Sequence, residues 1–142
     1  MSKRLWSAAL LVLVALLAGL MAGCIGPGGL KGDPLAGTSW TLAQLGDAVA
    51  LQGSEVTLQF DEGGVGGLAG CNHYGGEYAV DGHGLTLGPL HSTLMACADE
   101  HITAQEGRYL QALGQVERFE LKGGRLYLYG ADGLTVVLAG AD

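Results

Sequence analysis

From Thr38 onward, the chain consists of short segments in which apolar and polar residues alternate with a period of two. In the clearest segment Val56, Leu58 and Phe60 share one side, and polar residues occupy the other. This alternation predicts strands with one buried and one solvated face. A first strand begins near Trp40, and further strands are predicted at 56–60, 65–69, 77–80, 84–87, 116–121, 125–129 and 134–138.

The connections between these segments are rich in glycine, as in 122–124 and 131–133. Glycine readily adopts the positive φ that tight hairpin turns require. Most of the 26 glycines are therefore explained by turns. No glycine-rich stretch ends in Lys-Ser or Lys-Thr, as a phosphate-binding loop would.

One segment departs from the strand pattern. Residues 99–113 contain one glycine and repeat apolar residues at a helical spacing. Asp99 is a suitable N-cap and Gly114 a suitable stop. The sequence therefore predicts a mainly β fold: a small antiparallel β-barrel of about eight strands with one α-helix packed against it.

The first 23 residues predict an export signal. Lys3 and Arg4 precede an uncharged apolar run over 5–22, and small residues lie directly before Cys24. This arrangement resembles the lipobox of bacterial lipoproteins, in which the cysteine is lipid-modified and becomes the first residue. We therefore expect a signal peptide at 1–23, a lipidated Gly-Pro-rich tether at 24–34 and one domain at 35–142. An uncleaved membrane helix is the alternative, because the run is just long enough to span a bilayer.

Charge narrows the possible partners. The residues after the signal peptide include five basic and fourteen acidic side chains, a net charge of −9. Such a domain would be repelled by nucleic acid and by anionic lipid headgroups. We expect no nucleic-acid partner. The acids are scattered, which favours a solubilising surface.

Two cysteines remain once Cys24 is assigned to lipid. Outside the cytoplasm such a pair tends to oxidise, so we predict a disulfide between Cys71 and Cys97. A zinc site is the alternative, because histidines lie near both cysteines in Cys71-x-His73 and Cys97-x-x-x-His101, with His91 between. Neither spacing is specific alone, and we expect no metal.

The same cysteines lie in two motifs, Gly70-Cys71-Asn72 and Ser92-Thr93-Leu94-Met95-Ala96-Cys97. With Gly76-x-Tyr78, a Gly-Thr-Ser-Trp-x-Leu start at 37–42 and a Leu-x-Leu-Tyr-x-x-Asp-Gly stretch at 126–133, they resemble the META domain, also called the HslJ-like family. The resemblance spans about 35–138. It implies a small barrel with one helix, common in envelope lipoproteins, without established enzymatic activity, and named after a heat-shock-linked protein. The family motif residues are Gly70, Asn72, Thr93 and Met95. The family often carries basic residues where this chain has His73 and Leu94.

No residues form a recognisable catalytic set. The chain has no Gly-x-Ser-x-Gly, and the acid pairs Asp61-Glu62 and Asp99-Glu100 fall at a turn and a helix start. We expect a monomeric, non-enzymatic protein without a cofactor, tethered by lipid outside the cytoplasm, and facing the periplasm from the outer membrane in a two-membrane cell. We expect it to act in envelope or stress biology through protein contacts. A barrel that binds a small ligand or lipid is the main alternative, with tyrosines 74, 78, 127 and 129 as candidate lining residues.

Overall fold

The computed structural model describes residues 32–141. The predicted signal peptide, the lipidation site at Cys24 and most of the predicted tether lie outside the described residues. Among the described residues no helix is both long enough and apolar enough to cross a membrane.

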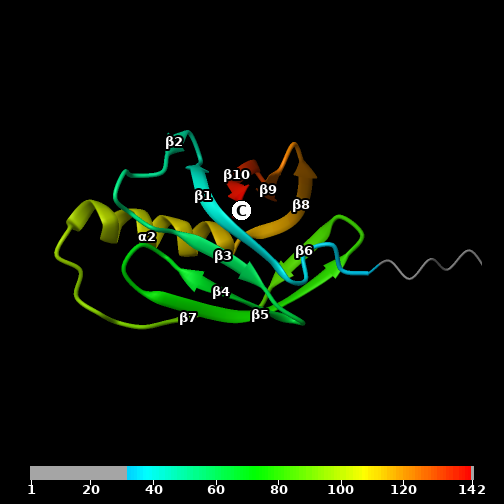
Figure 1. The fold of residues 1–142 in the computed structure, drawn as a ribbon, viewed down its shortest axis with the longest axis horizontal. Coiled ribbons are helices and arrows are strands. Elements are labelled where there is room, and N and C mark those ends of the chain that lie inside the picture. The colour runs from blue at the N-terminus through cyan, green and yellow to red at the C-terminus, as the bar shows by residue number, and fades with distance from the viewer. Residues whose placement is uncertain (1–31, 142) are drawn as a thin grey trace, which may run out of the picture. The chain divides into compact units, whose positions relative to one another are not determined.

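The described residues form one antiparallel sheet whose strands close into a ring, with helix α2 packed on it (Figure 1). The ring order is β1, β3, β4, β5, β6, β8, β9, β10, and β10 pairs again with β1. The short strands β2 and β7 lie outside the ring and pair with β1 and β5. The element bounds are β1 Thr38–Leu45, β2 Ala48–Val49, β3 Thr57–Phe60, β4 Gly64–Leu68, β5 His73–Asp81, β6 Gly84–Leu87, β7 His91–Ser92, α2 Glu100–Leu113, β8 Val116–Lys122, β9 Arg125–Gly130 and β10 Gly133–Gly140.

This architecture confirms the predicted small antiparallel barrel with one helix. Strand β1 closes the ring because Trp40 lies opposite Leu58 of β3 on one side and Gly140 of β10 on the other. The narrowest join is between β6 and β8, which share the single pair Gly84 and Arg118. The pairing of β1 with β10, the first and last strands described, therefore closes the barrel.

The core occupies the interior of the ring and the adjoining face of the helix. Leu58 and Phe60 are buried as the alternation predicts, and helix residues Tyr109 and Leu113 are fully buried in the same cluster. The helix therefore completes the core that the strands alone leave open on one side.

The helix ends agree with the prediction. The side chain of Asp99 accepts hydrogen bonds from the backbone N–H groups of His101, at 2.8 Å, and Ile102, at 3.4 Å. Gly114 ends the helix with a φ of −65°, so the stop does not use the left-handed conformation.

Two features of the sheet were not predicted. Strands β2 and β7 have two residues each, too few to show any periodicity. Strand β5 begins at His73, four residues before the predicted segment, and includes Gly75 and Gly76. A Cβ at Gly76 would lie 2.9 Å from Leu90 Cδ2, so these glycines allow the segment before β7 to pack onto β5.

Candidate functional site

The fold brings the two cysteine motifs together. Gly70, Cys71 and Asn72 lie in the connection from β4 to β5, and the second motif begins at Ser92, the last residue of β7, and continues into the connection to α2. The structure contains a disulfide between Cys71 and Cys97, with the two Cα atoms 6.1 Å apart. We call residues 93–98 the bridge loop, because this disulfide fastens it to the barrel.

Asn72 is the polar centre of the site and is buried. Its Oδ1 accepts hydrogen bonds from the Thr93 hydroxyl, at 2.8 Å, and the Met95 backbone N–H, at 2.7 Å. Its Nδ2 donates to Glu106 Oε1 at 2.8 Å. One side chain therefore links the bridge loop to the helix, and this gives Asn72, Thr93 and Met95 a shared structural role.

Glu106, on helix α2, also binds the first cysteine motif. Its Oε2 accepts hydrogen bonds from the backbone N–H groups of Asn72, at 2.8 Å, and Cys71, at 3.1 Å. Burial acts to raise the pKa of Glu106, but the hydrogen bonds from Asn72 and Cys71 outweigh it and hold this pKa below its ordinary value. The buried carboxylate is therefore ionised and satisfied at neutral pH.

Gly70 has a conformation and a position that only glycine suits. Its φ is +118°, and a Cβ would lie 3.0 Å from Ile102 Cγ2 and 3.2 Å from Ser54 Oγ. A side chain here would strain the backbone and press against the helix. The glycine of the motif thus lets the first cysteine approach α2.

Neighbouring helix residues extend the polar contacts. Gln105 accepts a hydrogen bond from the Leu51 N–H and donates one to Ser54 Oγ, both at 2.8 Å. The hydroxyls of Tyr109 and Tyr74 lie 2.9 Å apart, and burial raises the pKa of both. The described residues leave no buried side-chain polar atom without a hydrogen-bond partner.

Sequence reasoning missed Gln105 and Glu106. Two adjacent polar residues on an amphipathic helix are usually read as part of its solvated face. The available signal was their spacing: Gln105 lies four residues and Glu106 three residues before Tyr109, which places both beside the buried face. Their hydrogen-bond partners are 34 to 54 residues away in sequence.

The bridge loop exposes two large apolar side chains. Leu94 is 96% exposed and Met95 is 56% exposed, although they are the two residues after the hydrogen-bonded Thr93. Hydrogen bonds and the disulfide hold the loop backbone on both sides of them. The arrangement presents an apolar contact surface on a fixed backbone.

The candidate zinc ligands do not converge on one point. The sulfurs of Cys71 and Cys97 are bonded to each other. His73, His91 and His101 are exposed, and no three His, Cys, Asp or Glu side chains within residues 32–141 are placed to hold a metal ion.

The candidate tyrosines divide into two pairs. Tyr74 and Tyr78 are buried, whereas Tyr127 and Tyr129 are half-buried on β9. The ring of Tyr78 packs edge-on against Phe60, with the ring centroids 4.9 Å apart. The first pair therefore belongs to the core, and only the second pair reaches the surface.

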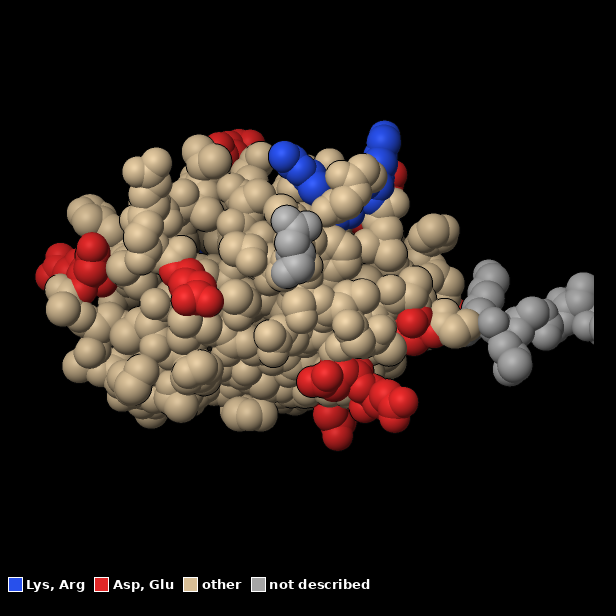
Figure 2. Space-filling model, in the orientation of Figure 1, with Lys and Arg blue, Asp and Glu red and all other residues tan. Residues whose placement is uncertain are grey.

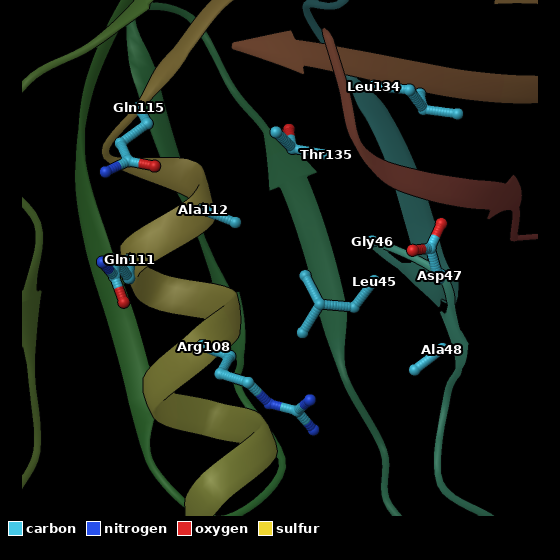
Figure 3. A pocket seen from close by; sticks show the side chains of 10 residues that line it. All are labelled: Leu45, Gly46, Asp47, Ala48, Arg108, Gln111, Ala112, Gln115, Leu134 and Thr135. Atoms are coloured by element: carbon cyan, nitrogen blue, oxygen red, sulfur yellow. The ribbon is translucent and has the colours of Figure 1, made fainter. Parts of the chain in front are cut away.

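An open groove of about 580 Å³ lies between α2 and the turn from β1 to β2 (Figure 3). Figure 3 shows the Arg108 side chain extending from α2 toward the β1–β2 turn, and the Leu45 side chain in the space between the helix and that turn. The groove has one acidic and one basic lining residue, Asp47 and Arg108, and it lies beside the barrel core. Its other lining residues are Leu45, Gly46, Ala48, Gln111, Ala112, Gln115, Leu134 and Thr135.

Comparisons with known proteins agree with the geometry. The family model described as "META domain" matches residues 33–142. A solved NMR structure of a protein from Burkholderia xenovorans is 30% identical, with 75% of this chain and 83% of that chain covered and a TM-score of 0.65. A second NMR structure, 21% identical with a TM-score of 0.59 over 74% of this chain and 90% of the other, shares the fold. No curated protein matches the chain.

Proposed function

The chain belongs to the META domain family, and from that premise we propose that it is a non-enzymatic envelope lipoprotein that binds a partner protein through its bridge loop. The observation that supports this role is the exposure of Leu94 and Met95 on a loop held by a disulfide and by Asn72. We further propose that the partner acts in envelope or stress biology.

The exposed pair favours a protein contact on physical grounds. When a partner covers large apolar side chains, the removal of their surface from water favours binding by roughly 25 cal/mol per Å² of apolar surface. A loop that is already fixed loses little conformational entropy on binding. Methionine also adapts its shape to irregular apolar pockets. The complementary surface would be an apolar cleft on another protein.

Photo-crosslinking in cells tests this contact. A photoreactive amino acid replaces Ala96, an exposed residue within the bridge loop. We expect one discrete crosslinked protein, and we expect Leu94→Ser to reduce its yield strongly. Val49→Ser is the matched control, because Val49 is 80% exposed but lies in β2, away from the loop in sequence. Equal loss in both variants would contradict the proposal.

A binding measurement with purified proteins is the second test of the bridge-loop contact. The protein identified by mass spectrometry should bind the full chain directly, and Leu94→Ser should weaken that affinity at least tenfold. Val49→Ser should change it less than twofold. A partner that binds the Leu94→Ser variant as tightly as the wild type would exclude the bridge loop as the contact.

The lipid anchor is tested separately. We propose cleavage before Cys24 and acylation of its thiol, with the domain held outside the cytoplasm. Cells grown with radiolabelled palmitate should label the wild-type chain, and mass spectrometry should find the residues before Cys24 removed. Cys24→Ser should abolish both. An unlabelled wild-type chain that retains its first residues would overturn this part.

Binding of a small amphiphile is the second candidate. Its support is the groove of about 580 Å³, in which Leu45 and Ala112 lie near the cationic Arg108. Because Arg108 and Asp47 both line the groove, it suits an apolar tail with a zwitterionic head. Organic extraction of the purified chain, followed by mass spectrometry, should release a stoichiometric lipid that Arg108→Gln reduces. Extraction that yields no lipid from the wild type would remove this candidate.

A further inference from the structure

The positive charges of the domain are concentrated on one hairpin. Residues 32–141 include thirteen acidic and only four basic side chains. Three of the four, Arg118, Lys122 and Arg125, lie on β8 and β9, and the fourth is Arg108 on α2. Figure 2 shows the blue side chains close together along the upper edge of the molecule, and red ones both beside them and elsewhere in that view. An acidic surface therefore contains one cationic region.

The register of the hairpin places these charges on one face. Arg118 lies opposite Tyr129, and Lys122 lies opposite Arg125. Between these pairs, Glu120 lies opposite Tyr127. Because side chains alternate along a strand, the intervening residues lie on the opposite side. Phe119, Leu126 and Leu128 are buried in the core there, whereas Leu121, next to the turn, is 41% exposed. We call the six outward residues 118, 120, 122, 125, 127 and 129 the cationic face.

Contacts within the face hold Arg118, the cation farthest from the hairpin turn, in place. The guanidinium carbon of Arg118 lies 3.7 Å from the centre of the Tyr129 ring, a cation–π contact. The Tyr129 hydroxyl donates a hydrogen bond to Glu120 Oε2 at 3.2 Å. Stacking uses the flat side of the guanidinium and leaves its N–H edge available to a carboxylate. Arg118 is therefore oriented before any partner arrives.

A shallow hollow of about 350 Å³ lies on the same face, and Tyr129, on which Arg118 stacks, is one of its lining residues. It is lined by both remaining cations, Lys122 and Arg125, by the turn residue Gly123 and by the other members of the face on β9 and β8, Tyr127, Tyr129 and Glu120. The hollow is small, so it can receive one or two acidic side chains. It is too small to enclose a folded domain.

We infer that the cationic face docks an acidic peptide segment of a partner protein. Charge complementarity along a narrow strip supports this docking, because two arginine guanidinium groups and one lysine can pair with successive carboxylates of a peptide. A flat anionic membrane fits less well, because it would also approach nearby acids such as Glu117 and Asp132, which are exposed. This contact is separate from the bridge loop and does not depend on it.

Fluorescence anisotropy with a labelled peptide of ten glutamates tests the docking. The full chain, purified in neutral detergent, should bind the peptide at low ionic strength and release it as salt is added. The triple variant Arg118→Gln, Lys122→Gln, Arg125→Gln should weaken binding at least tenfold. Arg108→Gln is the control, because it removes a positive charge from helix α2 and not from the cationic face, and it should change the affinity less than twofold. Leu94→Ser should also leave it unchanged, so failure here is distinguishable from failure of the bridge-loop proposal.

Two further variants probe the geometry of the face. Glu120→Gln removes its only acid and should raise the affinity about two- to fivefold, a gain that mere structural damage would not produce. Tyr129→Leu removes the ring beneath Arg118 and should lower the affinity several-fold. Tyr129→Phe keeps the ring and loses only the hydrogen bond to Glu120, so it should bind within twofold of the wild type.

Three results would overturn the inference. The first is no binding of the peptide by the wild type at low ionic strength. The second is equal weakening by Arg108→Gln and by the triple variant. The third is a clear preference for vesicles of anionic phospholipid, or self-association that depends on the three cations, over the acidic peptide.

Discussion

At the scale of single residues, the site depends on Asn72 and Glu106. The amide of Asn72 uses both its acceptor and its donor, and the Glu106 carboxylate receives three hydrogen bonds from Asn72 and Cys71. The motif around Cys71 identified Asn72 from sequence. It could not identify Glu106, because a residue's hydrogen-bond partners 34 positions away depend on the fold.

Replacing Glu106 by Gln should destabilise the domain by about 1–3 kcal/mol, because one amide oxygen cannot accept all three hydrogen bonds and the new NH₂ group faces other donors. Urea unfolding at pH 7 measures this loss. Glu117→Gln, at an exposed position on β8, is the control and should change the free energy of unfolding by less than 0.5 kcal/mol, about the limit for surface substitutions.

The same variant should change the dependence of stability on pH. The folded pKa of Glu106 lies below its ordinary value of 4.5, so the unfolded chain takes up this proton first as the pH falls. The stability from Glu106 is therefore present above about pH 4.5 and is lost below it. The wild type should lose more unfolding free energy than Glu106→Gln between pH 5 and pH 3. Parallel curves would contradict this.

At the scale of elements, helix α2 was the most predictable feature. Its apolar spacing and its cap at Asp99 are local properties of the chain, and the structure agrees at both ends. What local spacing did not predict is that the helix also buries polar side chains, Gln105 and Glu106, against loops. The two-residue strands β2 and β7 were likewise missed, since they exist only through their pairing with β1 and β5.

Replacing Asp99 by Ala should cost about 1 kcal/mol, because the backbone N–H groups of His101 and Ile102 lose their acceptor. Asp99→Asn is the matched control and should retain most of the stability, since asparagine also caps helices well. Thermal unfolding followed by circular dichroism measures both. Equal destabilisation by the two variants would show that charge at the helix start matters more than the cap.

At the scale of the whole molecule, the ring closes through residues from opposite ends of the domain. Strand β1 pairs with β10, and the Cys71–Cys97 disulfide joins the β4–β5 connection to the bridge loop. The period-two pattern predicted the eight strands of the ring. It contained no information on which strand lies beside which, because alternation records burial and not neighbours.

Replacing Cys71 and Cys97 together by Ser should lower the free energy of unfolding by about 3–4 kcal/mol, because the unfolded chain regains the freedom of the closed 26-residue loop. Chemical denaturation measures the change, and wild-type protein with reductant should shift to a similar midpoint. A loss below 1 kcal/mol would mean that Asn72 and Glu106 hold the bridge loop without the covalent bond.

The sequence by itself determined the eight strands of the ring, the glycine turns, the limits of the helix and the cysteine motifs, because all of these depend on neighbours within a few residues. Tertiary structure alone decided that Glu106 points inward, that Leu94 points outward, and that Arg118, Lys122 and Arg125 share one face. The physical reason is that burial, hydrogen-bond satisfaction and charge grouping depend on residues that become neighbours only after the sheet closes.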